Sequence, residues 1–427
     1  MALYIHVPFC RARCTYCDFT TYVGLESLMP TYVRALCREI ETEATRWNSP
    51  RVSTIYVGGG TPSLLPLEYL TEVLRTVRAE FDTSTCHEFT IEVNPGTVSD
   101  GYLSGLRSLG VNRLSIGVQS ADEQELQMLG RIHGWREAVD IVAAARRSGF
   151  DNLSLDLLLG LPGQRLRTWL ETLRRVLSLH PQHLSLYGLS LEEGTPLAER
   201  VVAGRLPAPD EAVAAAMYEL AEEVLFRNGF FHYEISNWAL VEDVAESPPC
   251  RWWPEEQAKQ SVSESRPSRS ENVGPYVCRH NLTYWRNQPW LGVGAGAHSW
   301  MPRRLGIDVP GVSRDRAGGR RWANPDHPEE YAAAAYASDD LLWQHRDIEH
   351  IGRQLEMGET MMLGLRLAEG INAEEFLARF GVGLQDLYGS ELGDLSRLGL
   401  LSWDGEVARL TRRGRLLGNQ VFERFLR

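Results

Sequence analysis

The sequence lacks several features that would assign it to a particular class of protein. No run of apolar residues approaches the roughly 18 needed to cross a bilayer, and no basic segment followed by an apolar one marks a signal peptide. Basic residues are outnumbered by acidic ones, 44 to 56, which gives a net charge of −12. We therefore expect a cytoplasmic protein with no transmembrane segment that binds no nucleic acid, although a transient membrane association stays open.

The sequence also has very little lysine, and its cysteines do not indicate disulfides. Lys259 is the only lysine among the 44 basic residues, a bias that we attribute to codon usage. The seven cysteines are an odd number, and a chain of 427 residues buries a core without disulfides. Three of them, Cys10, Cys14 and Cys17, lie within eight residues of one another, which indicates a binding site and not a disulfide framework.

Short runs rich in β-branched residues alternate with longer amphipathic runs in the first half of the chain. Tyr32, Leu36 and Ile40 illustrate the helical spacing, and further helices are predicted over residues 135–147 and 165–179. This alternation predicts a parallel α/β sheet, either a partial, open barrel of six units or a doubly wound sheet. The predicted strands are residues 3–7, 54–58, 88–93, 113–117, 152–157 and 183–189.

Polar residues and glycines follow these predicted strands closely. In parallel α/β folds the carboxyl ends of the strands carry the chemistry, so such residues would meet on one rim. Each one alone is typical of a strand-ending turn, but their recurrence favours a site. They are Gly58-Gly59-Gly60-Thr61, Glu92-Val93-Asn94, Gln119-Ser120, Asp156 and Tyr187-Gly188.

The second half of the chain is less regular. Residues 210–228 are predicted to be a helix and 230–235 a strand, and order is expected to resume at 276–285 and 290–300. Glycines at 292, 294 and 296 indicate that the backbone approaches another group closely there. We expect a core domain over 1–235, a flexible Ser-, Pro- and Glu-rich insertion over 241–275, a connecting segment over 276–350 at the mouth of the barrel, and a C-terminal domain over 351–427.

The C-terminal domain resembles a winged helix. Helices are predicted over 351–367, 372–380 and 383–398, then a hairpin over 400–410 that turns at Asp404-Gly405, and a last helix over 412–425. Winged helices often bind DNA, but the acidic chain and its scattered arginines favour packing or a partner protein.

The cysteine run has the spacing C-x3-C-x2-C and follows the first strand. Three thiolates on a short loop can hold three irons of a cubane cluster, which leaves the fourth iron open to chelation by a substrate or cofactor. Structural zinc is an alternative, but it needs a fourth ligand, and the nearby candidate, His6, lies within the strand. Three cysteines without a metal are the remaining alternative.

The cysteine motif resembles that of the radical SAM superfamily. In that superfamily the open iron of a [4Fe–4S] cluster binds S-adenosylmethionine (SAM), and an electron from the cluster splits it to methionine and a 5′-deoxyadenosyl radical. The segment Gly58-Gly59-Gly60-Thr61-Pro62 is similar to the superfamily's glycine-rich segment after the second strand. The resemblance implies a partial (β/α)6 barrel, related to the TIM barrel, with both cofactors bound.

Further motifs narrow the resemblance to the oxygen-independent coproporphyrinogen dehydrogenases and the related HemW family of haem chaperones. The C-terminal part looks like a HemN-type C-terminal domain, so the resemblance covers nearly the whole chain outside the insertion. The motifs are residues 4–10 (YIHVPFC), 115–120 (SIGVQS), 156–164 (DLLLGLPGQ), 233–237 (YEISN) and 294–298 (GAGAH).

The same resemblance implies a set of SAM contacts. Carboxylates suit ribose hydroxyls or an ammonium group and Arg131 suits a carboxylate, although Glu92 and Asp156 would also serve as ordinary caps of strand ends. The implied contacts are Tyr4 and Tyr16 near the cluster and adenine, Gly59, Gly60 and Thr61 at the methionine end, Glu92, Gln119, Arg131 and Asp156 at the ribose and carboxylate, and Ser190 on the adenosine side, with His298 a further candidate.

Two departures point away from the dehydrogenases and toward the haem chaperones. The dehydrogenases carry a fourth cysteine two residues after the third, where this chain has Phe19, and we expect this chain to lack the segment that they carry before the cluster, since Cys10 is already the tenth residue. The segment His280-Asn281-Leu282-Thr283-Tyr284-Trp285 is similar to the H-N-x-x-Y-W signature of the haem chaperones. Whether the chain is an enzyme stays open.

The resemblance makes His280 the expected haem ligand, with Cys278 second. Histidine, cysteine and tyrosine ligate haem iron, and Tyr284 and Trp285 offer flat apolar surface, while arginines could pair with propionates. The alternative is that this segment only packs, with His280 a hydrogen-bonded core residue.

We expect haem transfer to an acceptor protein, and we expect that cluster reduction by flavodoxin or ferredoxin gates haem release. The alternative is a radical SAM enzyme: a porphyrinogen oxidative decarboxylase of porphyrin biosynthesis, a methyltransferase or a cyclopropanase. The third hypothesis is that the chain is a scaffold protein without catalytic activity.

Overall fold

The computed structural model describes residues 1–241, 274–303, 318–335 and 346–426. The insertion predicted over 241–275 therefore lies almost wholly outside the described residues. Contacts within the chain group residues 1–221, 289–301 and 320–350 into one compact unit, and residues 222–288, 302–319 and 351–427 into a second. The connecting segment predicted over 276–350 is thus shared between the two units, and the domain boundaries drawn from the sequence stay predictions.

The first unit is built on six parallel strands that lie side by side in chain order. A doubly wound sheet would reverse its strand order at a switch point. No reversal occurs between these six, so the alternation builds the curved, singly wound sheet of a partial barrel, and all six predicted strands are confirmed. They are β1 (Ala2–Val7), β4 (Thr54–Gly59), β5 (Glu88–Val93), β6 (Arg113–Gln119), β7 (Leu153–Leu159) and β8 (His183–Gly188).

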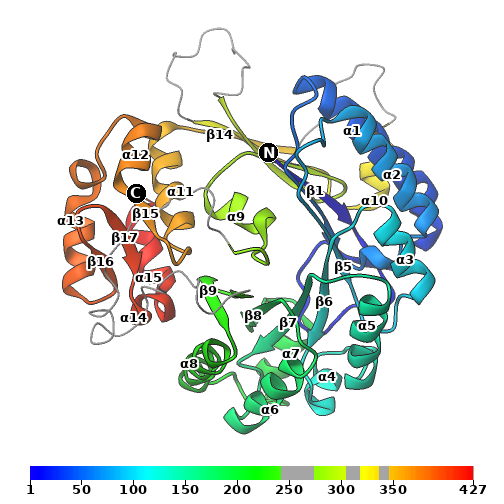
Figure 1. Cartoon of the computed structure of the whole chain (residues 1–427), viewed down its shortest axis with the longest axis horizontal. Helices are drawn as coiled ribbons and strands as arrows, with labels where there is room; N and C mark the ends of the chain where they lie inside the picture. The colour runs from blue at the N-terminus through cyan, green and yellow to red at the C-terminus, as the bar shows by residue number, and fades with distance from the viewer. Residues whose placement is uncertain (242–273, 304–317, 336–345, 427) are drawn as a thin grey trace. The chain divides into compact units, whose positions relative to one another are not determined.

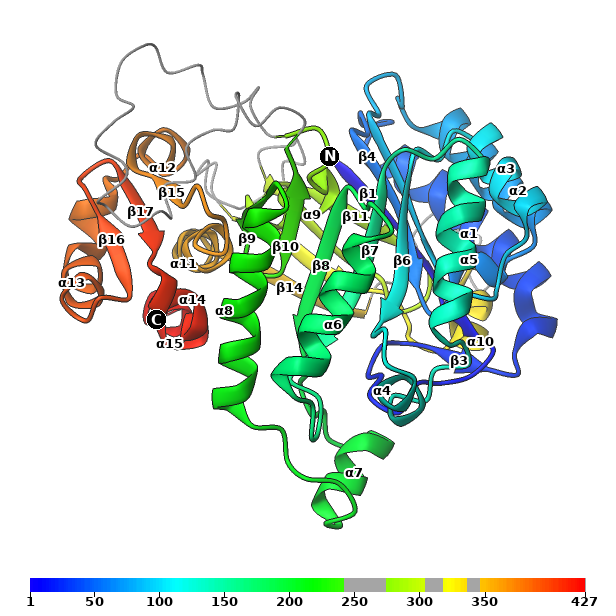
Figure 2. The same cartoon turned by 60° about the horizontal axis from the view of Figure 1, so that its bottom comes forward.

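Most of the helices that follow these strands lie on the outer side of the curved sheet (Figures 1 and 2). The predicted stripe on the first helix is confirmed, because Tyr32, Leu36 and Ile40 are all buried. Trp169 is buried in the same layer, and its indole N–H donates to the Met217 carbonyl at 2.9 Å. The helices are α1 (Met29–Arg46), α2 (Leu67–Glu80), α3 (Asp100–Ser108), α4 (Glu123–Met128), α5 (Trp135–Arg147), α6 (Leu166–Leu177), α7 (Pro196–Val202) and α8 (Glu211–Arg227).

The sheet continues on the other side of β1 with strands that come much later in the chain. β11 (Trp290–Val293) pairs with β1 in parallel and with β12 (His298–Pro302) antiparallel, and β13 (Gly319–Ala323) and β14 (Arg346–Ile351) follow. The close backbone approach expected from the glycines is confirmed at Gly294, where a Cβ would lie 2.6 Å from the His6 carbonyl oxygen. Helix α10 (Pro328–Ala334) packs against α1.

The second unit contains a hairpin, a short helix and the C-terminal domain. β9 (Phe230–Glu234) pairs antiparallel with β10 (Asn237–Leu240), and α9 (Arg279–Trp285) carries the H-N-x-x-Y-W segment. In the C-terminal domain three helices pack with a three-stranded antiparallel sheet, in which the predicted hairpin supplies two strands and a third strand was not predicted. These elements are α11 (Arg353–Gly364), α12 (Ala373–Phe380), α13 (Leu384–Arg397), β15 (Ile371–Asn372), β16 (Leu401–Trp403) and β17 (Val407–Leu410).

The single helix predicted over 412–425 is wrong. The segment forms α14 (Arg412–Leu416), α15 (Gly418–Phe422) and a 3-10 turn, η5 (Glu423–Phe425), with a break at Leu417, whose φ of −114° and ψ of 28° are not helical. The break lets Val421, Phe422 and Phe425 enter the core of the domain. A straight helix would keep one continuous face instead.

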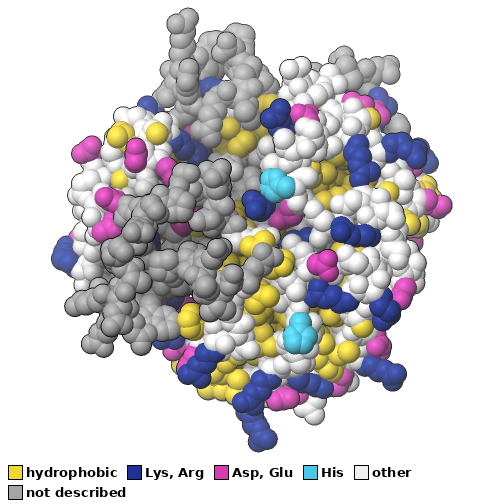
Figure 3. Space-filling model, in the orientation of Figure 1, with side chains coloured by type: hydrophobic (Ala, Val, Ile, Leu, Met, Phe, Trp, Pro, Cys, Tyr) yellow, Lys and Arg dark blue, Asp and Glu magenta, His cyan; other side chains and the backbone are white. Residues whose placement is uncertain are grey.

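Among the described residues, no helix is both long and apolar enough to span a bilayer. On the face shown in Figure 3, basic and acidic side chains of the described residues are interspersed, without a continuous basic stripe.

Candidate functional site

A pocket in the first unit collects the side chains at the carboxyl ends of the parallel strands. Its volume is about 390 Å³, within the range of small-molecule sites. The three clustered cysteines line it together with nine of the ten residues expected to contact SAM: Tyr16, Gly59, Gly60, Thr61, Glu92, Gln119, Arg131, Asp156 and Ser190.

The cysteine loop leaves β1 and is fixed at both ends and in its middle. The two-residue strand β2 (Phe9–Cys10) pairs in parallel with β3 (Tyr22–Val23). The backbone N–H of Thr15 donates to the Leu129 carbonyl at 3.0 Å, and its hydroxyl donates to the Met128 carbonyl at 2.9 Å. The three thiols are therefore presented by a braced loop.

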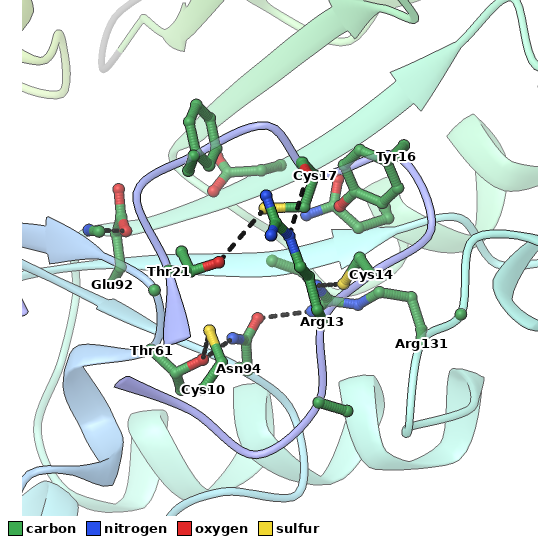
Figure 4. A pocket seen from close by; sticks show the side chains of 18 of the residues that line it. Cys10, Arg13, Cys14, Tyr16, Cys17, Thr21, Thr61, Glu92, Asn94 and Arg131 are labelled. Atoms are coloured by element: carbon green, nitrogen blue, oxygen red, sulfur yellow. Dashed lines mark hydrogen bonds between the residues drawn. The ribbon is translucent and has the colours of Figure 1, made fainter. Parts of the chain in front are cut away.

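Each cysteine sulfur has a polar neighbour (Figure 4). The Cys10 sulfur lies 3.5 Å from the Thr61 hydroxyl, and the Cys17 sulfur lies 3.9 Å from the Thr21 hydroxyl. Nη1 of Arg131 donates to the Cys14 sulfur at 3.4 Å. Hydrogen bonds of this kind stabilise thiolates and tune the potential of an iron–sulfur cluster.

The donor set fits a cluster held by three thiolates. Burial raises the pKa of the Cys10 and Cys17 thiols, so a positively charged group must offset that cost before both bind as thiolates. Among the residues that the structure describes, no three Cys, His, Asp or Glu side chains converge on a point as ligands of one metal ion. A cubane needs no such convergence, because each of three irons takes one thiolate.

The glycine-rich segment after β4 runs directly against the cysteine strand. The N–H groups of Gly60 and Thr61 donate to the carbonyls of Val7 and Phe9, both at 2.9 Å. A Cβ at Gly60 would lie 2.8 Å from the Cys10 sulfur, so a side chain there would displace a cluster ligand. Gly59 has φ of 121°, which favours glycine.

Two carboxylates sit in the interior of the sheet. Glu92 accepts hydrogen bonds from the Tyr56 hydroxyl at 2.8 Å and from the Gly59 N–H at 3.1 Å, and burial raises its pKa to about 7. Asp156 accepts from the Ser115 hydroxyl at 2.9 Å, and burial raises its pKa as well. Of the neighbours that hold these carboxylates, Gly59 and Ser115 lie in the quoted motifs, whereas Tyr56 does not.

Arg131 and Gln119 show further signs of a binding site. Nη2 of Arg131 donates to Asn94 Oδ1 at 2.5 Å and to the Gly117 carbonyl at 2.8 Å, so its guanidinium is fixed between three partners. Gln119 has φ of 68° where the pairing of β6 with β7 shifts register. Left-handed backbone at a non-glycine residue of a strand end is typical of functional sites.

Two residues expected near SAM lie outside the pocket lining, and two lining residues were not anticipated. Among the residues that the structure describes as lining the pocket, Tyr4 and His298 do not occur. Tyr4 instead lies with its hydroxyl 2.9 Å from Nδ1 of His6, and His298 is exposed. Thr21 and Tyr56 line the pocket without having been singled out, whereas Asn94 was expected on the rim and Ser115 lies in the motif 115–120.

The expected haem ligands lie in the second unit and are buried. His280 and Cys278 are each 1% exposed. Nε2 of His280 is 2.8 Å from the Tyr284 hydroxyl, and the N–H of Cys278 donates to the Tyr233 hydroxyl at 3.2 Å. In this conformation the H-N-x-x-Y-W segment forms internal contacts, so iron ligation by His280 stays a prediction.

Comparisons with known proteins agree over the whole chain. The profile of the Radical SAM superfamily matches residues 4–176, and that of the HemN C-terminal domain matches residues 353–417. The heme chaperone HemW of Bacillus subtilis is 33% identical over 428 residues, covering 99% of this chain and 98% of the relative. That of Mycobacterium tuberculosis (strain H37Rv) is 34% identical over 427 residues, covering 99% and 94%.

A mitochondrial relative and a solved structure extend the comparison. Radical S-adenosyl methionine domain-containing protein 1 of Bos taurus is 34% identical over 420 residues, covering 97% of this chain and 84% of the relative. The structure of HemN from Escherichia coli, a coproporphyrinogen III oxidase and radical SAM enzyme, superposes with a TM-score of 0.76 at 21% identity, covering 100% of this chain and 89% of HemN. That likeness shows a shared fold.

Proposed function

The chain belongs to the HemW family of the radical SAM superfamily, and from that premise we propose that it binds haem and transfers it to an acceptor protein. The observation that carries the proposal is that one helix, α9, holds His280, Tyr284 and Trp285 together. The chain that contains this helix is similar over its full length to heme chaperones. Phe19, 64% exposed beside the cysteines, supports the same choice, since no fourth thiol stands there.

In this proposal the pocket of the first unit holds the cofactors. Cys10, Cys14 and Cys17 bind a [4Fe–4S] cluster, which supplies an open iron for SAM and electrons for its cleavage. Thr61, Thr21 and Arg131 donate to the thiolate sulfurs and hold them in place.

The pocket carboxylates fit the polar ends of SAM. Glu92 and Asp156 present oxygens that accept from ribose hydroxyls or an ammonium group, as the resemblance implies. Because both side chains are already fixed by neighbouring donors, they are oriented before SAM enters. Gln119 and Ser190 line the same pocket and complete the polar contacts.

Haem is bound as cargo by α9, with His280 as the iron ligand and Cys278 as the second candidate. Nε2 of His280 is occupied by the Tyr284 hydroxyl, so loading requires that this hydrogen bond be exchanged for the iron. Ring surface from Trp285 and Tyr284 then contacts the macrocycle.

A radical SAM enzyme acting on a porphyrinogen or another substrate is the second candidate. The observation in its favour is that the carboxylates Glu92 and Asp156 are held in fixed positions in the pocket to which the proposal assigns SAM. Haem transfer alone does not require SAM cleavage. The electron donor, whether flavodoxin or ferredoxin, and the haem acceptor belong to the same proposal.

The deciding experiment uses the anaerobically purified chain with its cluster reconstituted. The chain is loaded with haem and mixed with a haem-free globin as a generic acceptor, and transfer is followed by absorbance. In parallel it is incubated with coproporphyrinogen III, SAM and a reductant, and the products are separated. We expect haem transfer without decarboxylation. Decarboxylation without haem binding would favour the enzyme.

The gating idea has its own control. If reduction of the cluster governs release, Cys14→Ala must bind haem as wild type does but no longer respond to reductant in the transfer assay. Equal transfer with and without reductant in the wild type would rule the gate out.

A further inference from the structure

Arg366 lies directly after α11 and stacks on the aromatic ring that ends the H-N-x-x-Y-W segment. The guanidinium carbon is 4.3 Å from the centroid of the Trp285 ring. The backbone of Arg366 is fixed, since its carbonyl accepts from the Ile235 N–H at 3.2 Å and the Ala368 N–H donates to the Tyr233 carbonyl at 2.9 Å. The YEISN segment therefore holds this arginine beside α9.

The guanidinium of Arg366 has no hydrogen-bonding partner within the parts of the chain that the structure describes. Its Nε is buried and has no hydrogen-bonding partner among the described residues, while the side chain as a whole is half-buried. Neighbouring arginines of the same unit differ. Arg286 donates to Glu369 at 3.0 Å, and Arg379 donates to Glu356 at 2.7 Å. An unpaired guanidinium stacked on an indole is oriented for a ligand.

The adjacent carboxylate does not satisfy this arginine. Glu234 is 1% exposed, and one of its oxygens accepts from the Asn237 amide while Oε2 has no partner among the described residues. Burial raises the pKa of Glu234 to about 7, although the positive charge of Arg366 opposes that shift. The two side chains form no ion pair in the described structure, so the outer nitrogens of Arg366 stay available to an incoming anion.

We propose that Arg366 binds a propionate carboxylate of the haem carried by α9, with the Trp285 indole holding the guanidinium fork in place. The proposal rests on the proposed function and adds the residue that selects the orientation of the porphyrin. A guanidinium binds a carboxylate through two parallel hydrogen bonds, which suits a propionate at the edge of a macrocycle. Because stacking on the indole already restricts the guanidinium, less conformational entropy is lost when it binds a carboxylate.

The test measures whether the arginine and the propionates act on each other. Ferric haem and its dimethyl ester, whose propionates are uncharged, are titrated in the same detergent buffer into the full-length wild type, Arg366→Gln and Arg366→Lys. Arg286→Gln is the matched control, because it removes a neighbouring arginine that is already paired. Binding is read from absorbance and tryptophan quenching.

We expect Arg366→Gln to bind haem about 10-fold more weakly, the size of one charge-assisted hydrogen bond, and to bind the ester as wild type does. Arg366→Lys should lie between, and Arg286→Gln should match wild type. Equal losses for haem and ester would overturn the proposal, because they would mean that Arg366 only supports Trp285. Unchanged haem binding in Arg366→Gln would overturn the proposal for Arg366 and leave the proposed function intact. A wild type that binds no haem would overturn both.

Discussion

The pocket of the first unit and the α9 region of the second unit present their polar groups in opposite ways. In the pocket, thiols and carboxylates from several strand ends face a cavity and are braced from behind by serines, threonines and Arg131. Around α9, His280 and Cys278 are buried and their polar atoms contact tyrosine hydroxyls. Under the proposed function, the pocket would take its ligands with its side chains already in place, whereas haem binding at α9 would require the exchange of internal hydrogen bonds.

The largest effect is expected from Cys14→Ala. Two thiolates cannot hold a cubane that needs three, so the variant should lose the cluster, measured as iron and sulfide per chain after reconstitution. Cys86→Ala is the control, because the Cys86 sulfur lies away from the pocket and donates to the Glu88 carbonyl at 3.5 Å. A full cluster in Cys14→Ala would contradict the assignment of the loop.

The strand-end site could be predicted because parallel strands place their carboxyl ends on one rim whatever the details of packing. Cys10, Gly59, Glu92 and Asp156 could all be assigned from their position after a strand and their resemblance to motifs. Tyr56 could not, because it acts from within a strand and lies in no quoted motif, and alternation predicts only which face it occupies.

The second region was harder to predict because its contacts join distant segments. Arg366 contacts Trp285, which lies 81 positions earlier in the sequence. A lone arginine after a helix belongs to no recognisable motif. The break at Leu417 was missed for a related reason: helical spacing over 412–425 is real, but burial of Phe422 and Phe425 in the domain core overrides it.

A smaller effect is expected from Asp156→Asn on SAM affinity. The change removes the negative charge that serine hydroxyls now orient toward the pocket, so SAM should bind about 10-fold more weakly by equilibrium dialysis. Asp100→Asn, an exposed carboxylate paired with Arg147, should leave affinity unchanged. Wild-type affinity in Asp156→Asn would remove this residue from the SAM site.

Tyr284→Phe tests whether the α9 region has to open. Loss of the hydroxyl leaves Nε2 of His280 without this partner, so the free energy of unfolding should fall by about 1–2 kcal/mol in urea titrations. Haem affinity should stay equal or rise, because the iron no longer competes with the hydroxyl. Tyr102→Phe, which removes a hydroxyl bonded to the Leu65 carbonyl in the first unit, controls for a general loss of stability. Haem binding that weakened only in Tyr284→Phe would mean that the hydroxyl itself contacts haem.

A further effect concerns Glu234 and the dependence of stability on pH. Burial raises its pKa from the ordinary 4.5 to about 7, so the folded chain holds the proton more tightly than the unfolded chain. Stability from this group is complete below about pH 4.5 and falls by up to about 1.4 kcal/mol per pH unit until about pH 7.

Urea unfolding at about pH 5 and about pH 8 should therefore differ less in Glu234→Gln than in wild type. Arg366→Gln should extend the decline to higher pH, since it removes the positive charge that favours ionisation of Glu234. If the free energy of unfolding depended on pH in the same way in all three proteins, Glu234 would not be protonated in the folded state.

The most direct test is a haem titration of the reconstituted chain, compared among wild type, Cys14→Ala and His280→Ala, with circular dichroism to verify folding. The account predicts one haem per chain in wild type and in Cys14→Ala, and at least about 10-fold weaker binding in His280→Ala, the loss of one good ligand interaction. Haem binding that survives in folded His280→Ala but disappears in Cys14→Ala would contradict it, because haem would then belong to the cysteine pocket and not to α9.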